Sequence, residues 1–511
     1  MKNSTKKLRF SILSIFSLVL FISCNNDDDA ITNPGTTPVI TDPDPSGTVV
    51  LDNEINQFIF ESMWLWYLWD SDVPEFADGY FEDQDEYFTH LNSFSSPVDV
   101  FNDITISKDR FSGITDNYDL LFNSLAGVFK SNGLEFTLTA APEGLPKVVG
   151  FVRYVVNGSD ASTKNIKRGD FFYAVNGIEL YYNNASDNNL NLLDPDSYTV
   201  NLADIDVNTL TTIPNGENVE LTKSELVENP IHVSKTLDVN GTKIGYLMYN
   251  QFVRDGYNEQ LNEVFAQFNA DGVTEFVLDL RYNSGGSTLT AIHLASLITG
   301  QFNDQLFYKE TWNTKWNDIL STENNFVDEF ANGGGALNSI NMNRIYVLAT
   351  DETASASELI INGLTPYIDV IHIGDTTLGK NEFSVSLVDK PDQGEQIPPY
   401  VYVGEESLEG VNPDHKYAMQ LLAGTNENAA GFSDYTLGLT PDIELQEVIT
   451  QLGELGDPEE PLLAKAIEEI TGVSSRKKNI KVSERLKVKT LKSSKDYTLT
   501  KDNMYWDFFK K

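Results

Sequence analysis

The chain has 511 residues, of which 41% are hydrophobic, and it carries a formal net charge of −40 at pH 7. This length allows roughly two to four domains of 100–200 residues, each with enough apolar residues to build a core. A protein this acidic repels the phosphates of nucleic acids, so no nucleic-acid partner is expected. The single cysteine, Cys24, excludes intrachain disulfides and thiolate metal clusters.

Residues 1–23 are expected to be a secretion signal. An apolar stretch over residues 10–22 is shorter than the roughly 20 residues that span a bilayer. It follows four basic residues, Lys2, Lys6, Lys7 and Arg9. Without residues 1–23 the chain has 32 Lys and Arg against 76 Asp and Glu, a net charge of −44.

Cys24 stands in LFISCNNDDD, a sequence that resembles the lipobox of bacterial lipoproteins, although Phe21 replaces the commoner leucine. The resemblance implies that Cys24 is lipidated and becomes the new N-terminus. It also implies a membrane contact through that lipid and a location in the cell envelope, at the outer membrane facing the periplasm or the exterior. Residues 24–50, rich in Asp, Asn, Thr, Pro and Gly, predict a flexible tether.

Residues 51–112 predict a helical N-terminal domain, because apolar residues recur there at a spacing of about 3.6. Three tryptophans in this region, Trp64, Trp66 and Trp69, suit either a packed core or a surface that stacks against sugars. An aromatic stripe at helical spacing usually faces a core, so a core is the expectation.

Residues 115–226 predict a β-rich domain, with apolar strands separated by Gly, Asn and Asp. One strand ends at Val156, a short helix follows around residues 162–165, and another strand ends at Asn176-Gly177. This order resembles the central part of a PDZ domain, which implies binding of a peptide C-terminus as an added strand. Its carboxylate-binding amides are expected in SNGLEF, at Gly133 and Leu134.

Residues 237–448 alternate apolar strands with helical stretches, which predicts an α/β unit around a buried, partly parallel sheet. The expected fold class is therefore α/β, or α+β when all domains are taken together. Residues 476–511 hold 12 Lys and Arg against 4 Asp and Glu. This basic C-terminal tail is either a solvated segment or one that contacts anionic lipid or the protein's own acidic surface.

The stretch DETASASEL, residues 351–359, directly follows the apolar run RIYVLAT. Ser355, three residues before Glu358, fits both a helix-capping box and a nucleophile on a strand-to-helix turn. No histidine motif of a triad or a metal site accompanies it, so neither a metal nor a cofactor is expected. A serine nucleophile without a histidine base can use a lysine. Lys380 follows an apolar strand and a glycine, a setting that can desolvate and neutralise its amine.

Three separated segments resemble the C-terminal processing (tail-specific) serine peptidases: ATDETASASELIINGL, IHIGDTTLGK and FVLDLRYNSGGS. The resemblance implies Ser355 as nucleophile, Lys380 as general base, and an oxyanion hole made by Gly285 or Gly286 together with Ala356. It also implies a protease core of the crotonase-like type after a helical region and a PDZ-like domain. Such an enzyme would be a serine endopeptidase acting on polypeptides presented by their C-terminal tails.

One position departs from the family pattern. Many members carry a glutamine four residues after the lysine, and this chain has Ser384 there. The lysine is then oriented by Ser384, by a residue elsewhere in the chain, or by none. This departure and the tryptophans at 64–69 leave an alternative function, a catalytically degenerate surface lipoprotein that binds peptides or glycans.

Overall fold

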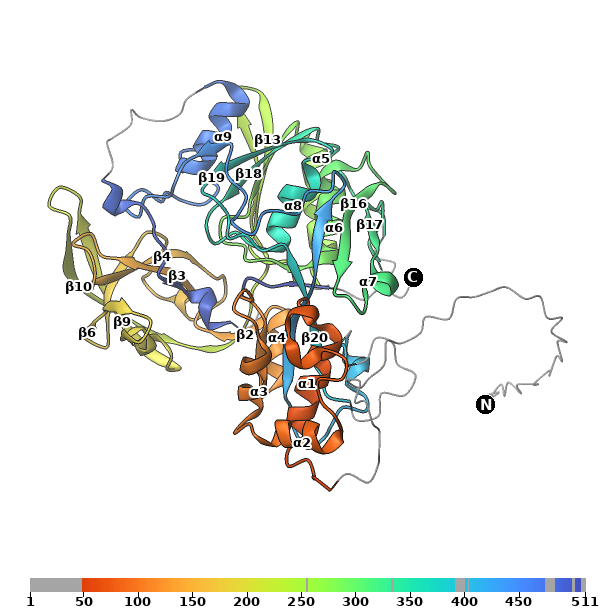
Figure 1. The fold of residues 1–511 in the computed structure, drawn as a ribbon. Helices are drawn as coiled ribbons and strands as arrows, with labels where there is room; N and C mark the ends of the chain where they lie inside the picture. The colour runs from red at the N-terminus through yellow and green to blue at the C-terminus, as the bar shows by residue number, and fades with distance from the viewer. Residues whose placement is uncertain are drawn as a thin grey trace, which may run out of the picture. The chain divides into compact units, whose positions relative to one another are not determined.

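The fold is seen in a computed structural model that describes residues 48–253, 256–331, 335–390, 400–402, 404–473, 483–498 and 501–506 (Figure 1). All of these residues belong to one compact unit, Pro34–Lys511. The expected signal, Cys24 and most of the expected tether lie outside the described residues. None of the described helices is long and apolar enough to cross a membrane.

The N-terminal region is helical, as predicted. Each of its three α-helices follows a polar residue whose side chain accepts a hydrogen bond from the first turn, which satisfies an otherwise unpaired donor. Trp66 is fully buried and stacks on Trp316 with 4.5 Å between ring centroids, and Trp64 is buried as well. The structure therefore confirms that these two tryptophans belong to a core. The helices are α1 (Glu54–Trp66), α2 (Gln84–Asn92) and α3 (Pro97–Ile104).

The second region is β-rich, as predicted, and has its own apolar core. Its main sheet has the strand order β10-β9-β5-β4-β3-β23, with antiparallel neighbours. The last of these strands, β23, comes from the C-terminal tail. The strands are β3 (Leu134–Ala140), β4 (Val148–Val155), β5 (Phe171–Val175), β9 (Ser197–Asp206), β10 (Thr211–Thr222) and β23 (Lys492–Ser493). A separate pair is formed by β2 (Val128–Ser131) and β11 (Ser224–Val227).

A six-stranded sheet forms the centre of the third region, in the order β12-β13-β14-β18-β19-β22. All neighbours after β13 are parallel, whereas β12 is antiparallel to β13. Val277 and Leu278 are adjacent and fully buried in two different clusters, so both faces of the sheet are covered. This explains the continuous apolar runs in the sequence. The strands are β12 (Ile231–Val239), β13 (Thr242–Tyr249), β14 (Glu275–Asp279), β18 (Arg344–Ala349), β19 (Asp369–Gly374) and β22 (Ile443–Glu444).

Helices pack on this sheet and complete the α/β unit (Figure 1). The last of them follows residue 448, so the unit continues beyond the stretch in which the sequence shows strand–helix alternation. The helices are α5 (Asn258–Asp271), α6 (Thr288–Thr299), α8 (Ala356–Leu364) and α9 (Pro461–Thr471).

A further sheet has the order β15-β24-β20-β21-β16-β17, and β1 pairs with β21. Its second strand, β24, again comes from the tail. The described tail residues therefore contact the protein itself, one of the alternatives that the tail's charge left open. The strands are β1 (Gly113–Thr115), β15 (Gly286–Ser287), β16 (Leu306–Trp312), β17 (Glu323–Asn325), β20 (Glu382–Val388), β21 (Ala418–Asn428) and β24 (Met504–Tyr505).

Candidate active site

The three segments singled out by the sequence follow three adjacent parallel strands. The Gly285-Gly286 pair follows β14, Ser355 follows β18, and Lys380 follows β19. Because β14 pairs with β18 and β18 with β19 in parallel, their carboxyl ends lie at one edge of the sheet. That edge is where open α/β sheets place ligands and reacting groups.

Ser355 is the residue that caps α8, and its backbone has φ 66° and ψ −118°. A positive φ is unfavourable for a residue with a side chain and is found most often at functional sites. Its N–H donates to Glu358 Oε2 at 2.7 Å, but its Oγ has no hydrogen-bond partner among the described residues. Glu358 thus caps the backbone of Ser355, and the buried hydroxyl is available for chemistry.

Glu358 joins the serine and lysine segments. Its Oε2 accepts from the backbone N–H of Ser355 at 2.7 Å and from that of Lys380 at 2.9 Å. Its Oε1 accepts from Gly379 N–H at 2.8 Å and from Thr377 Oγ1 at 2.5 Å. Burial raises the pKa of this carboxyl to about 7, while these hydrogen bonds oppose the rise. One side chain therefore holds the backbones of both candidate catalytic residues.

Lys380 is completely buried. Burial disfavours its ammonium form and lowers its pKa to about 8, although Glu382, Asp502 and other carboxylates oppose the shift. Its Nζ lies 4.7 Å from the centre of the Phe111 ring. The guanidinium of Arg110 also donates to the carbonyl of Gly379, so the end of the N-terminal region covers the lysine. An amine with this pKa can serve as a base near neutral pH.

The lysine amine is hydrogen-bonded to the side chain of Asn503, a residue of the C-terminal tail. Lys380 Nζ donates to Asn503 Oδ1 at 3.4 Å, and Ser384 Oγ also hydrogen-bonds to that oxygen. Gln420 Nε2 in turn donates to Ser384 Oγ at 2.8 Å. Ser384 therefore reaches the lysine through Asn503. The sequence left three possibilities for the group that orients the lysine: Ser384, a residue elsewhere in the chain, or none. In the structure a residue from elsewhere in the chain, Asn503, lies between Ser384 and the lysine amine.

Gly285 and Gly286 both adopt positive φ; Gly285 lies against the serine segment and Gly286 against Phe252. A Cβ on Gly285 would be 2.6 Å from Ser355 Cβ and 3.1 Å from the amide nitrogen of Ala356, so only glycine fits. The Gly285 N–H donates to Asn283 Oδ1 at 2.9 Å within its own turn. Of the expected oxyanion donors, Gly285 and Ala356 thus lie together beside Ser355, but the Gly285 amide has an internal acceptor.

The expected carboxylate-binding loop lies at the start of β3. Its two amides have partners within the loop, because Gly133 N–H donates to Ser131 Oγ at 2.9 Å and Leu134 N–H donates to Asn132 Oδ1 at 3.0 Å. Among the described residues, no group of three or more His, Cys, Asp or Glu side chains is arranged to hold a metal ion.

Sequence reasoning did not assign roles to Glu358 beyond capping, or to Asn503 and Phe111. For Glu358, its position three residues after Ser355 was the sequence signal for a role in the site, because a capping glutamate lies close to the turn that carries the serine. Asn503 is 119 residues beyond Ser384, so no local pattern could have linked them.

Two stretches of the chain match models of one peptidase family. Residues 243–416 match the model of peptidase family S41, and residues 54–113 match the peptidase S41 N-terminal domain. A carboxyl-terminal-processing protease of Picosynechococcus sp. is 26% identical over 279 residues, which cover 54% of this chain and 60% of that protein. Carboxyl-terminal-processing peptidase 2, chloroplastic, of Arabidopsis thaliana is 24% identical, covering 57% of this chain and 53% of that protein.

A solved structure, a putative S41 protease from Bacteroides fragilis, superposes with a TM-score of 0.62 at 27% sequence identity. The superposition covers 83% of this chain and 98% of that one, whereas the matches to the two curated relatives span only about half to three-fifths of their lengths. The family match over residues 243–416 includes Ser355, Lys380 and the Gly285-Gly286 pair, and the match over residues 54–113 includes α1, α2 and α3. Over residues 54–113 and 243–416, the chain matches the two domains of peptidase family S41.

Proposed function

We propose that this protein is a serine endopeptidase that cleaves peptide bonds with Ser355 as nucleophile and Lys380 as general base. The observation that carries the proposal is the shared Glu358 carboxyl, which binds the backbone N–H groups of Ser355 and of the fully buried Lys380 at one edge of the sheet. Among the residues that the structure describes, the Ser355 hydroxyl has no hydrogen-bond partner. A free hydroxyl and a buried amine are two of the groups that an acyl-transfer site without histidine needs, and in this structure Lys380 Nζ is hydrogen-bonded to Asn503 and not to Ser355 Oγ.

In the proposed reaction, neutral Lys380 Nζ takes the proton of Ser355 Oγ, which attacks the carbonyl carbon of the peptide bond. The N–H of Ala356, at the start of α8, and an amide of the Gly285-Gly286 pair stabilise the oxyanion. The lysine ammonium then gives its proton to the leaving amine, and an acyl ester forms on Ser355. Water, deprotonated by the lysine, hydrolyses this ester and restores the free serine.

The substrate would be a polypeptide, captured by the PDZ-like domain through its C-terminal tail. Support comes from the outer side of β3, which among the described residues pairs only with the two-residue strand β23, at Thr137 and Leu138, and where an extended peptide could be added in its place. Gly133 and Leu134 stand at the start of that strand, and binding a carboxylate there would require their amides to exchange Ser131 and Asn132 for the ligand.

The test of this function is the incubation of the purified chain with an unstructured protein that has an apolar free C-terminus. New termini are expected, identified by mass spectrometry. A protein that binds this substrate without producing new termini would instead be the degenerate binding lipoprotein, an alternative favoured by the complete burial of Ser355.

We also propose that the protein is anchored at the outer membrane through a lipid on Cys24. The lipobox-like sequence and the Pro- and Asp-rich stretch after it support this location. Cys24→Ser is expected to move the protein from the membrane fraction of its cells to the soluble fraction, measured by fractionation and immunoblotting. A membrane-bound Cys24→Ser protein would contradict the anchor.

Removing the shared carboxyl should damage both the fold and the site. In Glu358→Ala, buried donors from Ser355, Lys380, Gly379 and Thr377 lose their acceptor, which should lower the free energy of unfolding by at least about 3 kcal/mol. The accompanying displacement of serine and lysine should reduce cleavage by about 10²-fold in the protein that still folds. Urea unfolding and a cleavage assay measure the two effects.

Glu310→Ala is the matched control. Glu310 is also buried, its pKa is also raised to about 7 by burial, and it also accepts several hydrogen bonds, from Tyr308, Trp312, Thr322 and Asn324. Since none of these residues belongs to the catalytic edge, this variant should lose stability but keep its cleavage rate. Equal loss of cleavage in both variants would show that Glu358 acts only through stability.

A further inference from the structure

The tail of the chain lies along two backbone edges that a polypeptide substrate would use. Its described residues, 483–498 and 501–506, first add a strand to the β-rich domain and then enter the sheet beside the candidate active site. In Figure 1 this segment is the blue end of the ribbon. Each of these placements has its own set of contacts.

At the first edge, β23 pairs antiparallel with β3, with Lys492 opposite Leu138 and Ser493 opposite Thr137. The N–H of Leu491 donates to the carbonyl of Leu138 at 2.8 Å. An antiparallel strand that runs along an exposed sheet edge toward the beginning of β3 is the geometry of peptide recognition by strand addition. The tail thus occupies, within its own molecule, the edge proposed for substrate capture.

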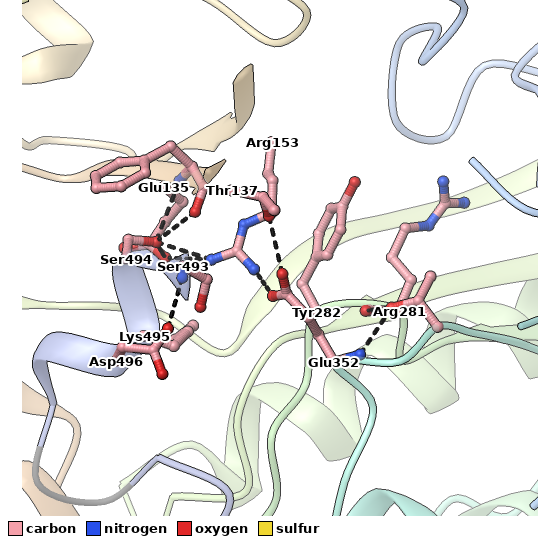
Figure 2. Close-up of polar contacts among 12 residues, drawn as sticks. Glu135, Thr137, Arg153, Arg281, Tyr282, Glu352, Ser493, Ser494, Lys495 and Asp496 are labelled. Atoms are coloured by element: carbon pink, nitrogen blue, oxygen red, sulfur yellow. Dashed lines mark hydrogen bonds and ion pairs between the residues drawn. The ribbon is translucent and has the colours of Figure 1, made fainter. Parts of the chain in front are cut away.

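Ser494 anchors the tail at this edge (Figure 2). Its Oγ accepts from Phe136 N–H at 3.1 Å and from Arg153 Nη2 at 2.8 Å, and it donates to Glu135 Oε2 at 2.6 Å. The fully buried Arg153 also forms an ion pair with Glu352, three residues before Ser355. The contacts at the β3 edge and the nucleophile segment therefore share one arginine.

The tail does not fill the space beside β3. A cavity of about 600 Å³ lies between β2, β3 and tail residues 494–498. Apolar groups form much of its wall, among them those of Leu134, Phe136, Leu193 and Tyr198. The edge can therefore take an extended segment whose side chains are larger than the serines that the tail places there.

At the second edge, β24 lies between β15 and β20. Gly286 is opposite Met504, and Tyr505 is opposite both Ser287 and Ser384, all in parallel pairing. The carbonyl oxygen of Asn503 is only 2.8 Å from where a Cβ of Gly285 would be, so the tail backbone passes directly over the oxyanion glycines. Trp506 N–H continues the pairing by donating to the Ser384 carbonyl at 2.9 Å.

These contacts close the site. Ser355 and Lys380 are both 0% exposed, and Asn503 is 3% exposed. A polypeptide cannot bring a carbonyl to Ser355 Oγ while residues 503–505 hold this position. The tail's own strands, β23 and β24, are each only two residues long. Any extended chain can replace their main-chain hydrogen bonds.

We propose that residues 491–498 and 501–506 are intramolecular occupants of the substrate path, and that an extended polypeptide binds by displacing them from β3 and from the slot between β15 and β20. The effect of the tail on cleavage rests on the proposed peptidase function, whereas displacement of the tail can be measured by polypeptide binding alone. Because the tail is tethered, it competes at a high effective concentration and keeps the enzyme closed until a suitable polypeptide is present.

The experiment locks the tail reversibly. Thr137→Cys and Ser493→Cys face each other across β3 and β23, where direct partners are close enough for a disulfide to form with a small adjustment. The full chain carries these changes together with Cys24→Ser, so that no other cysteine is present. Asp238→Cys with Lys243→Cys, opposite each other in the β12–β13 hairpin, is the matched control pair.

Binding is followed in a Ser355→Ala background by the fluorescence anisotropy of a labelled unstructured polypeptide with an apolar C-terminus. We expect oxidation of the tail pair to weaken binding at least tenfold and reduction by dithiothreitol to restore it, with no change for the control pair. In the chain that retains Ser355, the cleavage rate should follow the same pattern. Equal binding in the oxidised and reduced forms, or no binding in the reduced form, overturns the proposal.

The two proposals fail in different ways. Lock-sensitive binding without cleavage in any form would retain the tail's role and reject the peptidase function. Cleavage that is equally fast in the locked and unlocked forms would retain the peptidase function and reject the tail's role. A second measurement needs no engineered cysteines: in Ser355→Ala, saturating polypeptide should increase hydrogen exchange at the amides of Leu491 and Trp506, and unchanged protection of both would overturn displacement.

Discussion

Replacing Ser355 by alanine is expected to lower the rate of peptide-bond cleavage by at least about 10³-fold, because no acyl ester can then form. The change removes one hydroxyl that has no hydrogen-bond partner among the described residues, so the free energy of unfolding should hardly change. The measurement is the initial rate of substrate loss, followed by mass spectrometry beside a urea unfolding curve.

Ser357→Ala is the matched control for this substitution. Ser357 lies in the same first turn of α8, is equally buried, and donates its hydroxyl to the Asn283 carbonyl at 3.0 Å. Losing that bond should cost about 1 kcal/mol of stability and leave the cleavage rate within several-fold of the unaltered chain. A Ser355→Ala protein that cleaves as fast as the Ser357→Ala protein would reject Ser355 as the nucleophile.

Replacing Lys380 by methionine should separate activity from stability. Loss of the base is expected to reduce cleavage by about 10²–10⁴-fold. Stability at pH 7 should rise, because the pKa of Lys380 falls from 10.5 to about 8 in the folded protein, a difference worth about 3 kcal/mol when the amine is protonated. Cleavage assays and urea unfolding at pH 7 measure the two changes, and Lys309→Met, at a half-exposed lysine on β16, is the control.

The pH dependence gives a second signature of the same lysine. Its folded pKa is lower than its unfolded pKa, so the unfolded state binds more protons between about pH 8 and 10.4. Stability from this group is therefore lost as pH falls from about 10.4 to about 8, and Lys380→Met should remove that dependence. Cleavage by the unaltered chain should rise with pH through about 8 as the amine becomes neutral. A rate that is constant from pH 6 to 9 would contradict lysine as the base.

Much of this protein is determined by local sequence. The helical N-terminal region, the β-rich middle and the α/β unit each have the periodicity of their secondary structure. The positions of Ser355, Lys380 and the Gly285-Gly286 pair also follow from sequence, since each comes directly after an apolar strand. Parallel strands place such segments at a common edge, so their order along the chain is enough to predict that they meet.

Only the tertiary structure decided how the site is closed and held. Asn503 lies 123 residues beyond Lys380, and β24 is two residues long, so neither leaves a periodic signal. The tail's lysines and arginines suggested solvation, but its attachment depends on backbone hydrogen bonds at sheet edges and on Ser494, whose partners Glu135 and Arg153 are more than 300 residues away. Backbone pairing between distant segments depends on which edges the folded sheets leave free, and side-chain composition carries almost no information about that.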